Sequence, residues 1–422
     1  MLNEEIIGEI RARAGELKKE IISYRRHLHK YPELGLEEHD TTRFVESKLR
    51  DLNIETRTNL YTVEDIQDEL AEMGEEMSPE HGVTGVVGEL QGNKPGKTVM
   101  LRADMDAIKV TESRNSEHLP AARDFRSSVS GVMHACGHDA HVAMLLGAAE
   151  ILAEMRESIS GRVKFLFQPD EERGCGAKLM LKTDVLKDVD SVFGIHVWSP
   201  LESGQVMINE GAMMASVDCF WLEVQGGGGH SSAPHETGDP LLAAHEIVDA
   251  LYRMDAREID ARSPSLISVE SFVSEADWGV IPQLARMRGT IRAFDDEVRQ
   301  KLLARTQDIG RRVARMNGLQ SEFDNLAAFP PTVNTKREAE LARSAAEKLF
   351  GDGVVSGKPV LSGEDFAQYL REKPGAFILM GTGNPDVGSD CPHHNPNFDV
   401  DESQLHRGAA LYSLIALSAL NG

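Results

Sequence analysis

Four short β-rich runs, set far apart and separated by helical segments, most strongly limit what this chain can fold into. After the first run, residues 140–155 (AHVAMLLGAAEILAEM) carry apolar side chains every three to four positions, which is typical of a helix. Strands that alternate with helices predict a largely parallel sheet covered on both faces. We therefore expect an α/β fold, with strands at 98–103, 162–167, 191–197 and 376–380.

A different order of elements occupies residues 210–325. It reads β-α-β-β-α-β, which is the ferredoxin-like unit. The expected strands are 218–224, 265–273, 284–294 and 320–325, and the expected helices are 239–254 and 295–316. Because 422 residues exceed one ordinary domain, we expect a large domain made of residues 1–209 and 326–422, with residues 210–325 inserted as a satellite domain.

Charge and cysteine content exclude several classes of protein. The net charge of −23 argues against a nucleic-acid partner, because phosphates attract basic surfaces. The chain has a charged N-terminal segment and no long apolar run, so we expect neither a signal peptide nor a membrane span. Four cysteines suit a reducing compartment, which predicts a cytoplasmic location. The most acidic stretch, residues 64–80, indicates either an exposed helix or flap, or a solvated surface insertion.

Side chains that could bind a metal follow the expected strands. In an open α/β sheet, ligands bind outside the carboxyl ends of the strands. Four strand ends should therefore point at one site. They would deliver Asp104 and Asp106 from the first strand, Asp170, Glu171 and Glu172 from the second, His196 from the third, and His393 and His394 from the fourth.

The segment MHACGHD, residues 133–139, adds a thiol and an imidazole to this site. Alternate residues of an extended segment share a side, so Cys136 and His138 can converge. Asp139 is placed to cap the helix expected from Ala140. Thiolate, imidazole and carboxylate together suit Zn, Mn, Co or Ni, so the ligand types alone do not choose the metal.

The adjacent carboxylates Glu171 and Glu172 need separate roles. In an extended turn their side chains point apart, so one can bind metal while the other faces the substrate water. Water on a divalent metal has its pKa lowered toward about 7, and a nearby carboxylate can pass the remaining proton to the leaving nitrogen. We assign Glu171 as the base and Glu172 as the ligand. Each motif alone could be a buried histidine or a surface pair, but independent accidents should not all fall at one sheet edge.

Nearly the whole chain resembles the M20 metallopeptidase and amidohydrolase family, in particular its branch of hippurate, N-acyl-amino-acid and auxin-conjugate hydrolases. The similar segments are YRRHLHKYPELGLEE, VMLRADMDAI, GVMHACGHDAH, VKFLFQPDEE, FGIHVW, GGHSSAPH, GTIRAF, SGEDF and HHNPNFDVDE. The resemblance implies a centre of two divalent metal ions, with manganese slightly favoured. Its implied base is Glu171, and its implied ligands are Cys136, His138, Glu172, His196 and His394.

The resemblance also chooses between the two neighbouring histidines and implies a partner. His394 is preferred to His393 because the sequence His394-Asn395-Pro396 aligns with the family's His-Ser-Pro. The family further implies that the satellite domain dimerises, as a homodimer or part of a higher homo-oligomer. It would lend His230 across the interface.

Several positions depart from the family pattern or bear on the substrate. Gly279 stands where the branch usually has an Asn that helps hold a carboxylate, and Asp170 stands where Ala is usual. Arg286, Arg288 and Arg292 alternate along one expected strand and so share a face. Arg286 and Arg288 could equally belong to a solvated sheet face, whereas Arg292 is the family's substrate-side arginine. Because guanidinium groups bind carboxylates in bidentate fashion, we expect a small anionic substrate, with an aromatic acid as one option.

These features favour a metal-dependent hydrolase of C–N bonds other than peptide bonds. The leading hypothesis is an amidohydrolase that releases an amino acid from an N-acyl or N-aroyl conjugate. The alternative is an aminohydrolase that releases ammonia from an aromatic amino acid such as a nitroanthranilate. A non-catalytic binding protein of the same fold is a third hypothesis, but such a protein would be expected to have lost its base or ligands.

Overall fold

The computed structural model describes residues 3–421, and the chain divides into two compact units. The larger unit holds the described residues up to Met213, then Val333–Lys358, and those from Asp365 onward. The smaller unit holds Met214–Thr332 and Pro359–Glu364. Each unit has its own hydrophobic core.

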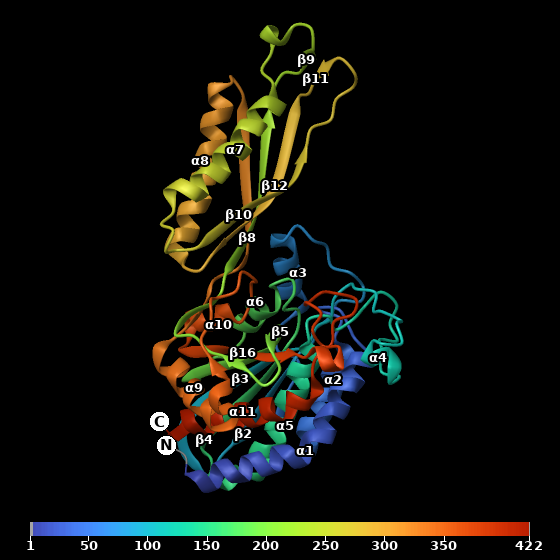
Figure 1. The fold of residues 1–422 in the computed structure, drawn as a ribbon, viewed down its shortest axis with the longest axis vertical. Helices are drawn as coiled ribbons and strands as arrows, with labels where there is room; N and C mark the ends of the chain where they lie inside the picture. Colours follow the sequence, from blue (N-terminus) through green and yellow to red (C-terminus); the bar gives the residue numbers. More distant parts are fainter. Residues whose placement is uncertain (1–2, 422) are drawn as a thin grey trace. The chain divides into compact units, whose positions relative to one another are not determined.

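A mostly parallel sheet forms the centre of the larger unit (Figure 1). Its strands lie in the order β1 (Glu55–Arg57), β2 (Val86–Gln91), β4 (Ser160–Gln168), β3 (Lys94–Asp104), β5 (Ser191–Glu202), β16 (Gly375–Gly383), β6 (Val206–Met207) and β15 (Val354–Val355). The four runs predicted from the sequence are the neighbours β4, β3, β5 and β16, and they pair in parallel. This confirms the predicted α/β fold with a mostly parallel sheet.

Helices cover both faces of this sheet (Figure 1). One face carries α1 (Glu4–Lys30), α5 (His138–Glu154), α9 (Lys336–Phe350) and α11 (Leu405–Asn421), and the other carries α6 (Gly176–Leu181) and α10 (Ala367–Glu372). Further helices are α2 (His39–Asp51), which packs on α5 and β2, α3 (Val63–Glu72), which packs on α6, and α4 (Leu119–Ala122). Short 3-10 helices lie at Arg156–Ser158, Gly351–Gly353, Pro385–Val387 and Glu402–Gln404. Among residues 3–421, none of the helices has both the length and the apolar character needed to cross a bilayer.

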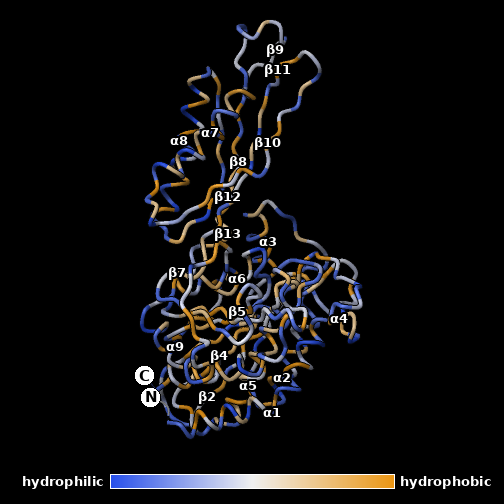
Figure 2. The backbone as a smooth tube through the Cα atoms, viewed as in Figure 1, coloured by the Kyte–Doolittle hydropathy of each residue, from blue (hydrophilic) through white to orange (hydrophobic). Residues whose placement is uncertain are grey.

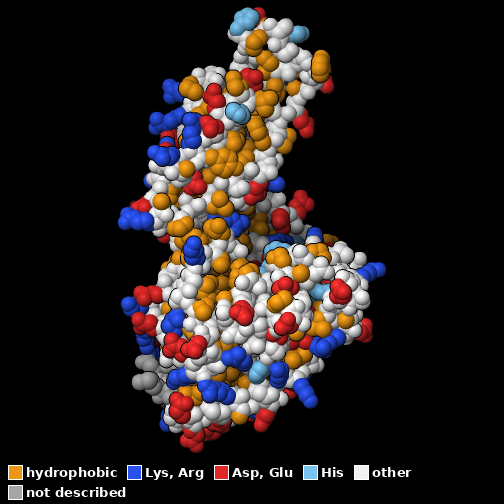
Figure 3. All heavy atoms as spheres, viewed as in Figure 1, with side chains coloured by type: hydrophobic (Ala, Val, Ile, Leu, Met, Phe, Trp, Pro, Cys, Tyr) orange, Lys and Arg blue, Asp and Glu red, His pale blue; other side chains and the backbone are white. Residues whose placement is uncertain are grey.

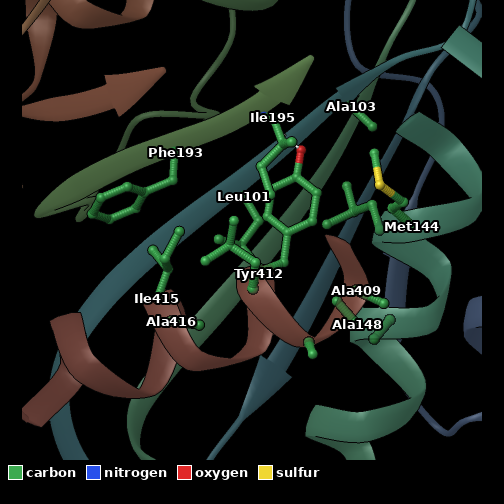
Figure 4. Packing of buried hydrophobic residues seen from close by; sticks show 14 of the residues in the cluster. Leu101, Ala103, Met144, Ala148, Phe193, Ile195, Ala409, Tyr412, Ile415 and Ala416 are labelled. Carbon is green, nitrogen blue, oxygen red and sulfur yellow. Dashed lines mark hydrogen bonds between the residues drawn. The ribbon is translucent and has the colours of Figure 1, made fainter. Parts of the chain in front are cut away.

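The core of the larger unit lies between the central strands and the pair α5 and α11 (Figure 4). Tyr412 of α11 is fully buried there, below Ile195 and beside Leu101. Its hydroxyl donates to the carbonyl oxygen of Arg102 over 2.7 Å and accepts from the amide of Ile195 over 2.9 Å. It therefore joins β3 to β5 just beyond Arg102 and Gly194, the last paired residues of these two strands.

The smaller unit is a four-stranded antiparallel sheet with two helices on one face (Figure 1). The strand order is β10 (Ser265–Val273), β12 (Leu284–Ala293), β8 (Ser216–Gln225) and β13 (Gln320–Phe329), and the helices are α7 (Pro240–Glu258) and α8 (Asp296–Met316). Figure 2 shows both helices alternating between hydrophilic and hydrophobic stretches, as expected for helices with one buried side. Along the chain these elements follow the expected β-α-β-β-α-β order.

The remaining elements are short. Strands β9 (Gly229–His230) and β11 (Val280–Ile281) pair with each other, a 3-10 helix lies at Pro234–Glu236, and β7 (Gly211–Met214) and β14 (Thr332–Asn334) adjoin the unit boundaries in the sequence. The segment Pro359–Glu364, which we expected in the large domain, belongs to the smaller unit. The reason is local, because Ala215 donates its amide to the carbonyl oxygens of Val360 and Ser362.

Candidate metal centre

Cys136 and His138 converge through a turn that the sequence analysis did not foresee. The segment is not extended at this point, because Gly137 has a φ of 88° and α5 already begins at His138. A side chain at Gly137 would also collide with Val197, since its Cβ would lie 2.4 Å from Val197 Cγ2. The left-handed glycine turns the chain sharply. It leaves ligand atoms of Cys136, His138 and His196 within 4.8 Å of one another.

Asp139 does not cap α5, so that expectation was wrong. The cap residue is Gly137, and Asp139 lies in the first turn of the helix. Its buried carboxylate instead accepts from Arg25 Nε over 2.9 Å and from His29 Nδ1 over 2.7 Å. The reason is that a buried guanidinium and imidazole reach this carboxylate from α1. This ion pair ties the start of α5, and with it His138, to α1.

The rings of His138 and His196 are fixed so that their Nε2 atoms face the cluster. His138 donates its Nδ1 proton to Asp106 over 3.0 Å, and His196 donates its Nδ1 proton to the carbonyl oxygen of Val197 over 2.6 Å. Such partners set the tautomer and the orientation of metal-binding histidines. His196 Nε2 then lies 3.6 Å from Cys136 Sγ. Within residues 3–421, the buried His138 Nε2 has no hydrogen-bond partner, which fits a nitrogen reserved for a metal.

The strand that carries His196 is longer than the expected 191–197, because β5 continues to Glu202. Strand β3 leaves β5 after Gly194, so three later amides of β5 need other partners. The amide of Ile195 donates to Tyr412, that of Val197 donates to His141 Nε2 over 2.8 Å, and that of Ser199 donates to His393 Nε2 over 3.2 Å. Side chains thus replace the departed strand and open the sheet edge at which the cluster lies.

This pattern separates the two histidines of the doublet. His393 uses Nε2 to accept from Ser199, while its ring stacks on Trp198 with the ring centres 4.7 Å apart. His394 has a φ of 64° and points its Nε2 at Glu172 Oε1, 3.3 Å away. Ligand atoms of Cys136, Glu172 and His394 lie within 4.8 Å of one another. The geometry therefore favours His394 as a ligand and gives His393 a structural role.

Glu171 and Glu172 lie in the turn that follows β4. The amide of Glu172 donates to Asp106 Oδ2 over 3.0 Å, so Asp106 braces both Glu172 and His138. Glu171 Oε1 accepts from the amide of Asp365 over 3.3 Å. Ligand atoms of His138, Glu171 and Glu172 form a third group within 4.8 Å. The structure therefore brings the proposed base next to the proposed ligands.

The charges in the cluster favour the binding of a cation. Burial alone would lower the pKa of His138, but the carboxylates of Asp104, Asp106 and Glu172 outweigh burial and raise that pKa to about 10. Burial and then the charges of Glu172 and Glu171 raise the pKa of the Cys136 thiol well above its usual value. The thiolate is therefore disfavoured unless a positive charge is bound beside it.

The donor set of the cluster fits divalent metal ions. Any two of the three groups described above have one residue in common, which is Cys136, His138 or Glu172. The groups therefore form one continuous cluster and not separate sites. Burial, and then His141 and His393, hold the pKa of His196 well below its usual value, which keeps that imidazole in the neutral form that binds metals. Sulfur, nitrogen and carboxylate donors together suit Zn, Mn, Co or Ni.

The other predicted site residues belong to the smaller unit. His230 is exposed in β9, where its Nδ1 accepts from the Ser232 amide over 3.1 Å. Arg286, Arg288 and Arg292 occupy alternate positions of β12, opposite the positions that are buried against α7 and α8. Arg286 is engaged in a 2.6 Å ion pair with Glu223, and Arg292 donates to the carbonyl oxygen of Leu361 over 2.6 Å.

Sequence reasoning missed some residues that support the cluster. His141 hydrogen-bonds Asp104 through Nδ1 and receives the Val197 amide on Nε2. It lies three residues after His138, a spacing that places both on one face of a helix and could have identified it. Asp104 and Asp106, which were expected among the potential ligands, instead orient His141 and His138.

Comparison with known proteins confirms the family resemblance. The model of peptidase family M20/M25/M40 matches residues 100–418. Thermostable carboxypeptidase 1 of Saccharolobus solfataricus is 38% identical, over 99% of this chain and 100% of its own length. N-acetyl-L-cysteine deacetylase of Bacillus subtilis is 34% identical, over 92% of this chain and 85% of its own length.

A solved structure adds the metal centre to this comparison. A Bacillus subtilis protein described as a dinuclear metal-binding peptidase of the M20 family is 32% identical, with a TM-score of 0.79. The match covers 96% of this chain and 99% of that one. It supports a dinuclear metal centre for the family. The chain therefore belongs to peptidase family M20/M25/M40 and is a metal-dependent amide hydrolase.

Proposed function

We propose that the protein hydrolyses the amide bond that joins an acyl or aroyl group to an amino acid, and that it releases the free amino acid. The observation that carries this proposal is the group of His138, Glu171 and Glu172, whose ligand atoms all lie within 4.8 Å of one another. A carboxylate beside a metal centre can serve as general base and then as general acid. Amide hydrolysis needs both steps.

In this proposal the side chains have distinct roles. Cys136, His138, Glu172, His196 and His394 hold two divalent ions, with manganese slightly favoured. These ions would polarise the amide carbonyl and make a water molecule more acidic. Glu171, held by the amide of Asp365, takes a proton from the attacking water and delivers it to the leaving nitrogen.

Carboxylate recognition is assigned to the arginines of β12. Arg292 and Arg288 are the stronger candidates, because Arg286 already pairs with Glu223. A guanidinium can bind a carboxylate through two parallel hydrogen bonds. We therefore propose an N-acylated amino acid, a small anion, as the substrate, and this anion can carry an aromatic group.

We also propose that two copies of the chain pair through the smaller unit. Large apolar side chains gather over α7 and β10 (Figure 3), and the exposed members include Leu242, Tyr252, Leu266, Phe272 and Val273. Strand β10 is at an edge of its sheet, and apolar edge strands readily pair with another chain. In such a dimer, His230 of the partner subunit would assist the reaction.

We also propose a cytoplasmic location. All four cysteines are free, which supports a location in the reducing cytoplasm.

The proposed function is tested with purified protein loaded with manganese. The substrates are N-acetyl and N-benzoyl amino acids, N-blocked dipeptides and aminobenzoates, with release of amino acid and of ammonia measured separately. We expect amino acid from the N-acyl amino acids, loss of activity with a chelator, and recovery when metal is restored. Ammonia without amino acid would overturn the proposal in favour of an aminohydrolase, and cleavage confined to the dipeptides would favour a peptidase.

A further inference from the structure

A cavity of about 270 Å³ in the larger unit reaches the metal centre. Asp106 and Glu172 of the centre belong to its lining, together with Glu75 and His81. These two residues come from residues 64–81, which are the acidic stretch 64–80 and the residue after it and are called the insertion below. An apolar cavity of roughly 150 Å³ is large enough to take up benzene, so this one can hold an aromatic ring. The insertion therefore bounds a space in which part of a substrate can lie.

The insertion begins as a helix with one buried side and continues as an irregular, largely exposed segment. Its helix α3 begins with a capping box between Thr62 and Asp65. Ile66 and Leu70 of this helix are fully buried. Glu69 is also buried, and its carboxylate forms an ion pair with Lys182 over 2.9 Å. The segment after α3 is held by its own contacts, because His39 Nε2 donates to the carbonyl oxygen of Glu80 over 3.0 Å and Arg173 donates to Glu75.

Arg173 connects the insertion to the catalytic turn. It directly follows Glu172, and its Nε pairs with Asp170 over 2.7 Å. Its two terminal nitrogens donate to the carbonyl oxygen of Gly35 over 2.9 Å and to Glu75 over 3.2 Å. One guanidinium thus holds the wall of the cavity and the turn that carries the proposed base.

The lining of the cavity combines aliphatic side chains with charged ones, several of which already have partners within the protein. Leu34, Ala107 and Ile108 supply aliphatic surface. The charged residues are the carboxylates of Glu37, Glu75, Asp106, Asp170 and Glu172, against the cations Lys109 and Arg173. Asp106 and Glu172 belong to the proposed metal centre, and Arg173 is already shared by Asp170 and Glu75, so its guanidinium is not free to bind a substrate carboxylate. The carboxylate end of an N-acyl amino acid should therefore lie elsewhere.

We propose that this cavity is the acyl pocket of the enzyme, and that the insertion sets the size of the acyl group it accepts through Glu75 and His81. The inference rests on the proposed function and names its substrate class, which is amino acids that carry an uncharged aroyl or similarly bulky acyl group. The insertion is then a specificity element. The carboxylate of the amino acid is recognised outside this cavity.

The test uses one leaving amino acid with acetyl, benzoyl and naphthoyl groups, and measures kcat/KM for each. Leu34→Trp and His81→Trp each place a larger side chain in the lining of the cavity. Each should lower kcat/KM for the benzoyl substrate about tenfold or more, relative to the acetyl substrate, because misfit groups in a pocket cost factors of roughly 10 to 200. Glu75→Ala should enlarge the pocket and raise the naphthoyl-to-benzoyl ratio.

The matched control is Glu76→Ala, which removes the neighbouring carboxylate. Glu76 is exposed and makes no ion pair within the part of the chain that the structure describes. The Glu76→Ala variant should leave the ratios of kcat/KM among the three acyl groups unchanged. Melting temperature and metal content are measured for every variant, so that a misfolded protein is recognised.

Two outcomes would overturn the acyl pocket. One is an equal effect of both tryptophans on all three substrates. The other is a change of preference among leaving amino acids with no change among acyl groups. If metal-loaded wild-type protein releases amino acid from none of the amides, the proposed function itself fails, which is distinct from an active enzyme whose acyl preference the variants leave untouched.

Discussion

His138 and Asp106 are joined by a hydrogen bond of 3.0 Å between Nδ1 and a carboxylate oxygen, and this bond leaves His138 Nε2 as the nitrogen that faces Cys136 and Glu172. Asp106 also accepts the amide of Glu172. One carboxylate therefore orients two proposed ligands at once. Metal centres lose affinity when such supporting bonds are removed, even though the ligands themselves remain.

Replacing Asp106 by Asn should weaken metal binding about 10- to 100-fold. The neutral amide accepts a weaker hydrogen bond and can present its NH₂ group, so His138 could protonate Nε2 and lose its lone pair. Metal affinity is measured by competition with a chelator of known strength. Asp124→Asn is the control, because the side chain of Asp124 is fully exposed. Equal affinities in the two variants would count against a positioning role for Asp106.

Replacing Glu171 by Gln should lower kcat about 10²- to 10⁴-fold while metal content stays normal. The amide cannot take a proton from water, but the proposed ligands are untouched. Kinetics and elemental analysis are measured on the same preparation. Glu172→Gln is the matched comparison and should lose metal as well as activity. If Glu171→Gln loses metal and Glu172→Gln does not, the two roles are reversed.

Much of the sheet could be predicted because its central strands have a local signature. β4 and β16 are buried along nearly their whole length, and β3 and β5 are buried over the stretches 98–104 and 191–197, so these parts read as apolar runs. The edge strands β1 and β15, and β6 next to β15, have only two or three residues each, and they form because a neighbour supplies hydrogen bonds. Such strands leave no pattern in the sequence.

The candidate site was predictable as a gathering of residue types, but its geometry was not. The strand-end rule found Glu171, Glu172 and His394 because each follows a recognisable strand. The roles of His141 and His393 depend on where β3 leaves β5, which is a property of the folded sheet. The left-handed turn at Gly137 is likewise set by its close approach to Val197.

Replacing Phe272 by Glu should weaken self-association at least about tenfold, because a charge is placed on the exposed apolar edge of the smaller unit. Phe272 is 41% exposed in edge strand β10. Molar mass is measured by light scattering over a range of concentrations, and kcat is measured in parallel. The control is Met316→Glu at the end of α8, where an apolar side chain is also exposed. Identical masses for both variants would argue against a dimer through β10.

The buried cluster around His29 should make stability depend on pH. Burial, and then Arg25, would lower the pKa of His29, but Asp139 and Glu112 outweigh them and raise it to about 9 from 6.5. Because the folded pKa lies above the unfolded value, protonated His29 stabilises the fold fully below pH 6.5, and this contribution is lost as pH rises toward 9. The pH-dependent part is on the order of 3 kcal/mol.

Urea unfolding of wild-type protein and His29→Gln at pH 6, 7.5 and 9 tests this. The difference in unfolding free energy between the two should be largest at pH 6 and should shrink toward pH 9, because wild type gradually loses the proton that the variant never binds. His27→Gln is the control, since burial and then Lys48 lower the pKa of His27 and so cannot produce this slope. A difference that stays constant with pH would show that His29 is neutral in the folded protein, and the ion pair with Asp139 would then be only a hydrogen bond.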